Sequence, residues 1–450
     1  MSLSIWAMVA YLAFIIVWNV VIKRNIGESM LLGFVVVCLF GGKDFFQILG
    51  TGIVDALQEQ VVFAALAFIF MGFMLKELGL MEKQVEILNS VFGRVRGGAG
   101  YVSTVASALF GTISGSGSGN AAAVGSVTIP WMTRSNWKPE IAASLVAGSS
   151  GLGPSFPPSS SMFVLLGSAA VAPFVAADQL FIGLFCGGAW ALLYRLIVVT
   201  IWIRIYGVDK VERADIQPFK AAIRQGWTSL FIYIGIAVPL LLTVGPGADW
   251  LTGRLGAETF ESISIIVWIP VMILLACLMV GAKHLPRSAK SWNKLLDKVA
   301  PQYSLVGATL FFAFAAASAL GELGLSEDLA VFMSRIEAPG LVVALAVGSL
   351  VVLLAAPLTS TATIAAVGGV AFTALTAAGA GPVPAAVAVL LFSATEGCSP
   401  PGAAPIYIVS GIAGVDPGKL FVRLILWFVI PTIILGSLVA LGLLPIFSIA

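Results

Sequence analysis

The chain has 450 residues, of which 59% are hydrophobic and only 10% are charged, whereas soluble domains carry about 25% charged residues. Too few polar side chains are present to cover a soluble surface, so the composition predicts an integral membrane protein. A net charge of +2 and a single histidine exclude a basic nucleic-acid-binding surface and a histidine metal cluster.

About ten apolar runs are long enough to cross a bilayer, which takes roughly 20 residues of helix. The runs are continuous and lack alternation of polar and apolar residues, so they predict helices and not a β-barrel. The sequence therefore predicts an all-α membrane protein. In chain order the runs cover residues 4–22, 29–42, 60–78, 139–172, 178–203, 228–244, 262–281, 303–321, 383–412 and 420–445.

Two further apolar stretches, 97–133 and 339–379, are rich in glycine, serine, threonine and alanine and are interrupted near the middle. Lys and Arg concentrate in cytoplasmic loops, and segments 204–227 and 282–302 carry five of these residues each. The charges of all loops agree only if 97–133 and 339–379 do not cross the membrane. Both stretches are therefore predicted to be re-entrant helical hairpins, with the N-terminus outside.

An internal repeat relates the two halves of the chain. With an offset of 243 residues, segment 117–158 aligns without gaps on segment 360–401, with 13 identities in 42 positions. Five predicted spans separate the copies, so the copies have opposite orientations in the membrane. Inverted repeats with interrupted helices are typical of secondary transporters, whose binding site lies near the bilayer midplane.

The tips of the two hairpins carry small polar residues. Their hydroxyl and amide oxygens, together with carbonyls freed from helical hydrogen bonding, suit a hard cation. A flexible turn, or a packing face at Gly111 and Gly115, is the alternative for an isolated tip, but two matched tips favour ion coordination. The tip residues are Ser114, Ser116, Ser118 and Asn120 in the first hairpin and Thr359, Ser360, Thr361 and Thr363 in the second.

Each predicted span at 139–172 and 383–412 contains a Pro-Pro pair with nearby glycines, which a continuous helix does not tolerate. Each helix should break there and restart, and the positive N-terminal end of the second half attracts anions. A proline kink that serves packing alone is the alternative. The candidate residues are Ser150, Gly151, Ser155, Pro157, Pro158 and Ser159 in the first break and Thr395, Glu396, Ser399, Pro400 and Pro401 in the second.

Glu396 is the most informative of these residues, because a carboxylate deep in the membrane is costly and marks function by default. It could ligate a cation, bind a substrate group or exchange a proton. A structural pairing with Arg195, which also lies in a predicted span, is the alternative. The candidate Na⁺ ligands are Ser116, Ser118, Thr361 and Glu396.

These motifs resemble the large membrane subunit of TRAP (tripartite ATP-independent periplasmic) transporters over essentially the whole chain. The most specific stretches are SGSGSGNAAAVGSVTIP, PEIAASLVAGSSGLGPSFPPS and EGCSPPGAAPIY. The resemblance implies a bacterial inner-membrane permease that works in an elevator-like way. It also implies an organic-anion substrate delivered by a periplasmic binding protein, a Na⁺ gradient (or protons) as the driving force, and a small four-helix membrane subunit as partner.

Two departures from the common family pattern concern charge. The pattern has an acidic residue in the second hairpin, where this chain has only threonines and a serine, and a small residue where this chain has Glu396. The resemblance implies scaffold helices at 1–78 and 204–302, with transport-domain repeats at 79–203 and 303–450. The repeats contain the hairpins 97–133 and 339–379 and the broken helices 139–172 and 383–412.

Three functions remain open on the sequence. The leading one is the TRAP-type permease, which is not an enzyme and requires no cofactor beyond its coupling ion. The second is a cation-coupled carboxylate symporter of similar architecture that needs no binding protein. The third is a membrane-embedded enzyme, which would require a paired nucleophile and base, or two carboxylates, facing one cavity, whereas only Glu396 is acidic and clearly within the membrane.

Overall fold

The computed structural model shows only helices, turns and one isolated β-bridge between Arg96 and Lys210 among the residues it describes. Within the described part of the chain, five helical runs are long and apolar enough to cross a membrane: Ala177–Tyr206, Phe219–Thr243, Tyr303–Glu322, Ser360–Ala377 and Gly418–Ala440. The predicted all-helical, multi-pass class is confirmed. The described residues are 2–58, 60–114, 117–210, 216–243, 246–256, 265–283, 285–325, 328, 331 and 338–447.

The N-terminal part contains five helices. They are α1 (Leu3–Ile16, extended by a π-turn at Val17–Val21), α2 (Ile26–Leu39), α3 (Phe45–Gln58), α4 (Gln60–Glu77) and α5 (Leu80–Phe92). Asn25 starts α2 by accepting a hydrogen bond from the Glu28 N–H at 2.8 Å. Helices α3 and α5 lie outside the predicted apolar runs. Both are amphipathic, so polar residues interrupt their sequences and no long apolar run results.

The first predicted hairpin and broken helix are both helical where expected. Helices α6 (Gly98–Ser114) and α7 (Gly117–Arg134) form the hairpin, and α8 (Pro139–Ser150) and α9 (Ser160–Leu166) flank the break. Helix α10 (Ala177–Tyr206) follows and ends at Gly207, whose φ of 62° ends the helix in the left-handed conformation.

The middle of the chain departs from the prediction most clearly at one helix. Helix α16 (Ala289–Glu322) begins well before the predicted span 303–321, so much of the basic loop 282–302 is helical. Ser288 caps it by accepting a hydrogen bond from the Ser291 N–H, and the lysines, leucines and alanines that follow are good helix formers. The preceding helices are α11 (Phe219–Gly226), α12 (Ile234–Thr243), α13 (Pro246–Leu255) and α15 (Ile265–Gly281).

The C-terminal part repeats the hairpin and the broken helix. Helices α18 (Gly340–Ala355) and α19 (Ser360–Ala377) form the second hairpin. Helix α20 (Pro382–Ser393), a 3₁₀ turn at Ala394–Gly397 and α21 (Ala404–Ala413) form the second break, and α22 (Gly418–Leu424) and α23 (Ile430–Ala440) close the chain. The length of α19 would also permit a crossing, so the re-entrant course of this hairpin stays a prediction.

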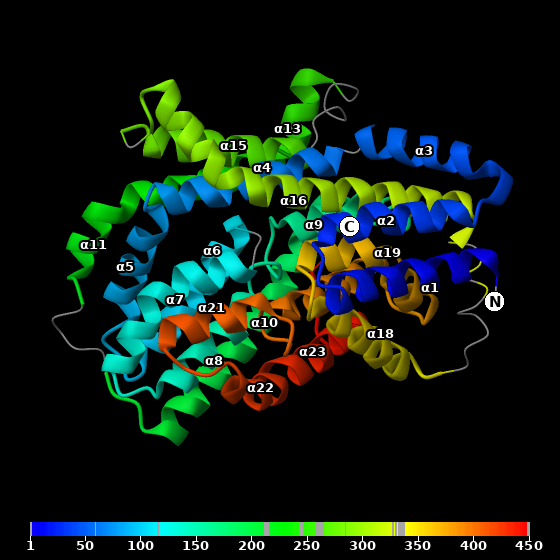
Figure 1. Cartoon of the computed structure of the whole chain (residues 1–450). Helices are drawn as coiled ribbons and strands as arrows, with labels where there is room; N and C mark the ends of the chain where they lie inside the picture. The colour runs from blue at the N-terminus through cyan, green and yellow to red at the C-terminus, as the bar shows by residue number, and fades with distance from the viewer. Residues whose placement is uncertain are drawn as a thin grey trace.

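Figure 1 shows two groups of helices. Helices α2, α3, α4, α15 and α16 run along one side, with α16 extending across it, while α6, α7, α8, α10, α21, α22 and α23 gather on the other. The second group interleaves the two halves of the chain, because α21 contacts both α7 and α8 and α20 contacts α10. The two breaks therefore meet in the protein interior, where segments 141–165 and 385–399 are buried throughout.

Candidate functional site

The tip of the first hairpin is only partly described. Ser114 is the last residue of α6, Ser118 and Asn120 lie in the first turn of α7, and Ser116 lies outside the described residues. Asn120 is fully buried and donates from its Nδ2 to the carbonyls of Ser107 and Ser150, at 2.8 and 2.9 Å. The first hairpin is thereby fastened to the end of α8.

Two buried oxygens beside this link lack a partner among the residues that the structure describes. They are Oδ1 of Asn120 and Oγ of Ser107, and both residues are completely buried. A buried polar atom without a hydrogen bond is costly and calls for an explanation, such as an ion. Ser107 was not among the predicted residues, because it lies mid-helix in α6, away from the tip.

The first break keeps its shape through local hydrogen bonds. The Ser155 hydroxyl donates to the carbonyl of Gly151 at 2.9 Å, and the Ser159 Oγ accepts from the Met162 N–H at 3.2 Å. Pro157 and Pro158 are buried. Ser150 uses its hydroxyl within α8, donating to Ala147 at 2.8 Å, while its carbonyl accepts from the first hairpin. The predicted interruption of the helix is therefore present in the fold.

The second hairpin presents its tip to the first broken helix. Ser160 and Thr361 hydroxyls lie 2.9 Å apart, and Ser161 donates to Ser360 at 3.0 Å. Thr359 is exposed and caps α19, whereas the Thr363 hydroxyl bonds within the helix. Ser160 and Ser161 directly follow the last candidate residue of the first break, Ser159, but were not predicted as site residues, since sequence alone does not reveal which residues of one half face the other.

The second break contributes a further serine and the carboxylate. The Ser393 and Ser360 hydroxyls lie 2.7 Å apart, and Thr395 bonds to the carbonyl of Phe392 at 2.8 Å. Ser399 is buried, and within the described part of the chain its hydroxyl has no partner. Pro400 is partly exposed and Pro401 is exposed. In both breaks the Pro-Pro peptide bond is cis.

Glu396 lies between the two hairpins and is only 5% exposed. Its Oε1 accepts a hydrogen bond from the Gly117 N–H at 2.7 Å, and its Oε2 accepts one from the Ser360 N–H. Gly117 begins α7 and Ser360 begins α19. One carboxylate therefore joins the starts of the second helices of both hairpins.

Arg195 does not pair with Glu396, the alternative that the sequence analysis considered. Its Nε donates to the carbonyl of Gly148 at 2.9 Å and its Nη1 to that of Ala191 at 3.2 Å. Gly148 lies in the last turn of α8, where the helix carbonyls carry negative charge. The guanidinium therefore stabilises the end of α8, while the carboxylate of Glu396 is bound by backbone N–H groups.

Close backbone packing holds the two breaks together. A Cβ on Gly151 would collide with the carbonyl of Ala394, and a Cβ on Gly397 would lie 2.9 Å from the Gly151 nitrogen. Such approaches require glycine on each side. Segments about 240 residues apart in sequence thus cross at glycines, directly beside Glu396.

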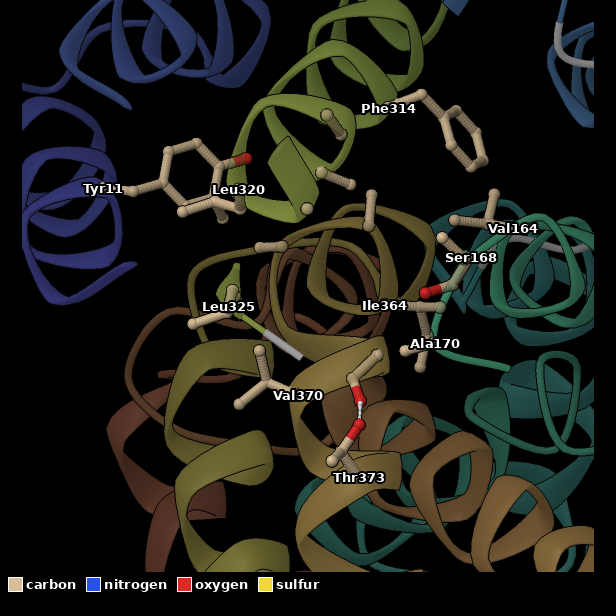
Figure 2. Close-up of a pocket in the computed structure, with 17 residues that line it drawn as sticks. Tyr11, Val164, Ser168, Ala170, Phe314, Leu320, Leu325, Ile364, Val370 and Thr373 are labelled. Atoms are coloured by element: carbon tan, nitrogen blue, oxygen red, sulfur yellow. Dashed lines mark hydrogen bonds between the residues drawn. The ribbon is translucent and has the colours of Figure 1, made fainter. Parts of the chain in front are cut away.

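A separate cavity of about 90 Å³ lies away from this site. Figure 2 shows Tyr11 of α1 and Phe314 of α16 on one side of it and Ile364 and Thr373 of α19 on the other, with Ser168 from the turn after α9. None of the predicted site residues lines it. Its lining is mostly apolar, and it lies where α16 faces α19.

Three comparisons relate the chain to known proteins. The family model described as "Tripartite ATP-independent periplasmic transporter, DctM component" matches residues 5–447. The chain is 26% identical over 202 residues to the C4-dicarboxylate TRAP transporter large permease protein DctM of Pseudomonas aeruginosa, covering 45% of this chain and 46% of that protein. It is 24% identical over 188 residues to the 2,3-diketo-L-gulonate TRAP transporter large permease protein YiaN of Escherichia coli, covering 41% and 43%. The chain thus spans less than half the length of these curated relatives.

Solved structures show the same fold at low identity. The YdaH transporter of Alcanivorax borkumensis superposes with a TM-score of 0.62 at 17% identity, over 89% of both chains. MtrF of Neisseria gonorrhoeae, described among a class of antimetabolite efflux pumps, gives a TM-score of 0.62 at 15% identity, over 89% of this chain and 85% of that one. Both neighbours are transporters, and the likeness extends to the arrangement of helices.

Proposed function

The chain belongs to the family of DctM components, the large permease subunits of TRAP transporters, and on this premise we propose that it imports a small organic anion of the carboxylate type across the bacterial inner membrane. The match to residues 5–447 carries the proposal. Relatives named for C4-dicarboxylates and for 2,3-diketo-L-gulonate support a carboxylate substrate. These relatives are permeases and not enzymes.

The transport step is proposed to be an elevator movement of two inverted repeats. In this scheme residues 79–203 and 303–450 move against the scaffold formed by 1–78 and 204–302. The interleaving of α7, α8 and α21 supports a single moving unit. Helix α16 contacts α2 and α3, and its residues Phe312 and Ser318, which belong to the moving unit in this scheme, pack against Phe34 and bind Asp55 of the scaffold.

Coupling to Na⁺ is proposed to involve Asn120. Its Oδ1 and the Ser107 Oγ are buried without partners in the described structure, whereas the carbonyls of Ser107 and Ser150 already accept hydrogen bonds from its Nδ2. Amide, hydroxyl and carbonyl oxygens are the donor set that a hard cation prefers. We expect Asn120→Ala to raise the Na⁺ concentration for half-maximal uptake by about tenfold, the effect of losing one good ligand worth about 1.4 kcal/mol.

The decisive experiment is uptake in liposomes that contain the chain, a small four-helix membrane subunit and a periplasmic binding protein. Labelled C4-dicarboxylate or a sugar acid should accumulate when a Na⁺ gradient is imposed and all three proteins are present. Varying pH at constant Na⁺ separates proton coupling from Na⁺ coupling. Uptake by the chain alone would support the self-sufficient symporter instead, and the absence of uptake for every carboxylate tested would refute the proposal.

A further inference from the structure

The surroundings of Glu396 are those of a bound anion. Each of its two carboxylate oxygens accepts a backbone N–H, one from Gly117 and one from Ser360. These are the first residues of α7 and α19, which have 18 residues each. Glu396 is buried, with an exposed fraction of only 5%.

The N-termini of two helices meet at Glu396, and together they favour a negative charge at this position. The first N–H groups of a helix have no partner within the helix and carry partial positive charge. Free phosphates, sulfates and carboxylates bind at single helix N-termini for this reason. At Glu396 each carboxylate oxygen accepts a hydrogen bond from one helix. A carboxylate therefore satisfies the N–H groups of both Gly117 and Ser360.

Gly117 makes room for this approach. A Cβ at that residue would lie 2.6 Å from Oε1 and 3.3 Å from the carboxylate carbon. In the described structure, the hydrogen bonds of the carboxylate come from N–H donors at positive helix ends. They repel a cation, so an oxygen held there is a poor Na⁺ ligand and a well-stabilised anion.

We propose that Glu396 is a tethered anion that occupies a carboxylate-binding position between α7 and α19. The side chain of Glu396 takes the place of a small free carboxylate in this position. It follows, if the proposed function holds, that the transported substrate presents no carboxylate at this position and is held by its other groups. Removing the side chain should leave a site for a monocarboxylate of one or two carbons.

The test uses Glu396→Ala in the purified full-length chain and measures thermal unfolding in detergent. Sodium formate or acetate should raise the Tm of this variant in a saturable manner. The wild type should bind the same anions at least about tenfold more weakly, since its position is filled. Sodium pivalate supplies equal charge in a shape too bulky for the vacated space and should have no such effect. Glu82→Ala, which removes an exposed glutamate from the first turn of α5, is the matched control and should not respond.

A second variant keeps the proposal testable if Glu396→Ala does not fold. Glu396→Gln preserves the shape but places an NH₂ group against one of the two N–H donors. Its Tm should fall below that of the wild type, and formate should not restore it because the volume is filled. A Glu396→Gln variant as stable as the wild type, or equal responses of Glu396→Ala to formate and pivalate, would overturn the proposal. These readouts do not involve transport, so they remain valid even if the proposed function fails.

Discussion

Replacing Gly402 by alanine should force the second break away from the turn of the second hairpin. A Cβ on Gly402 would lie 2.7 Å from the carbonyl oxygen of Ala356 and 2.9 Å from the Cα of Pro357. Ordinary van der Waals contact begins near 3.4 Å, so the segments must separate by about 0.5–0.7 Å. The obstructing atoms are backbone, and no side-chain rotation relieves the collision.

The magnitude follows from the surroundings of Gly402. Adding a methyl group to a well-packed position costs about 1–3 kcal/mol. Gly402 is exposed on one side, which allows partial relaxation, so we expect the lower part of the range, about 1–2 kcal/mol. The displaced turn leads directly into Ser360, whose N–H binds Glu396. Uptake should therefore fall as well as stability.

Thermal unfolding in detergent and initial uptake rates in liposomes measure the two effects. Gly411→Ala is the matched control, because Gly411 lies in α21 and a Cβ there meets no atom within 4 Å. That variant should melt at or slightly above the wild-type temperature, since alanine favours helix. If Gly402→Ala melts and transports like Gly411→Ala, the contact between the second break and the second hairpin does not constrain the protein.

Two further substitutions test the charged groups of the interior. Gly117→Ala places a Cβ 2.6 Å from Oε1 of Glu396 and should lower the initial uptake rate by about tenfold through the loss of one charge-assisted hydrogen bond; a wild-type rate in liposomes would show that this bond is dispensable. Arg195→Lys keeps the buried charge but a single ammonium cannot match the two-carbonyl fork, so stability should fall by about 1.5–3 kcal/mol in thermal unfolding, and an unchanged Tm would mean that charge alone matters at the end of α8.

The sequence predicted the hairpins and breaks closely because their signals are local. The interruption inside 339–379 corresponds to the turn between α18 and α19, whereas the interruption inside 97–133 falls in part outside the described residues. A Pro-Pro pair with nearby glycines interrupts a helix, so the positions of the two breaks can be read without knowledge of the fold. Helices α3, α5, α11 and α13 were missed because they lie outside the long apolar runs from which the crossing helices were predicted.

The partners of the site residues could not be predicted in the same way. Glu396 was identified by its cost in the membrane, yet its bonds go to backbone groups of Gly117 and Ser360, which no side-chain pattern reveals. Ser107 and Ser161 were missed for a similar reason, since their roles depend on which segments meet in space. Arg195, considered as a partner of Glu396, instead bonds to carbonyl oxygens.

The bond between Glu396 and Gly117 also has a consequence for biosynthesis. The two residues are 279 positions apart, and ribosomes add about 5–20 residues per second. For many seconds after α7 has been made, its first N–H groups lack the carboxylate that binds them in the finished protein. The first half therefore lacks this contact until the second break has been synthesised. The bond between Glu396 and Gly117 can then form and join the two halves.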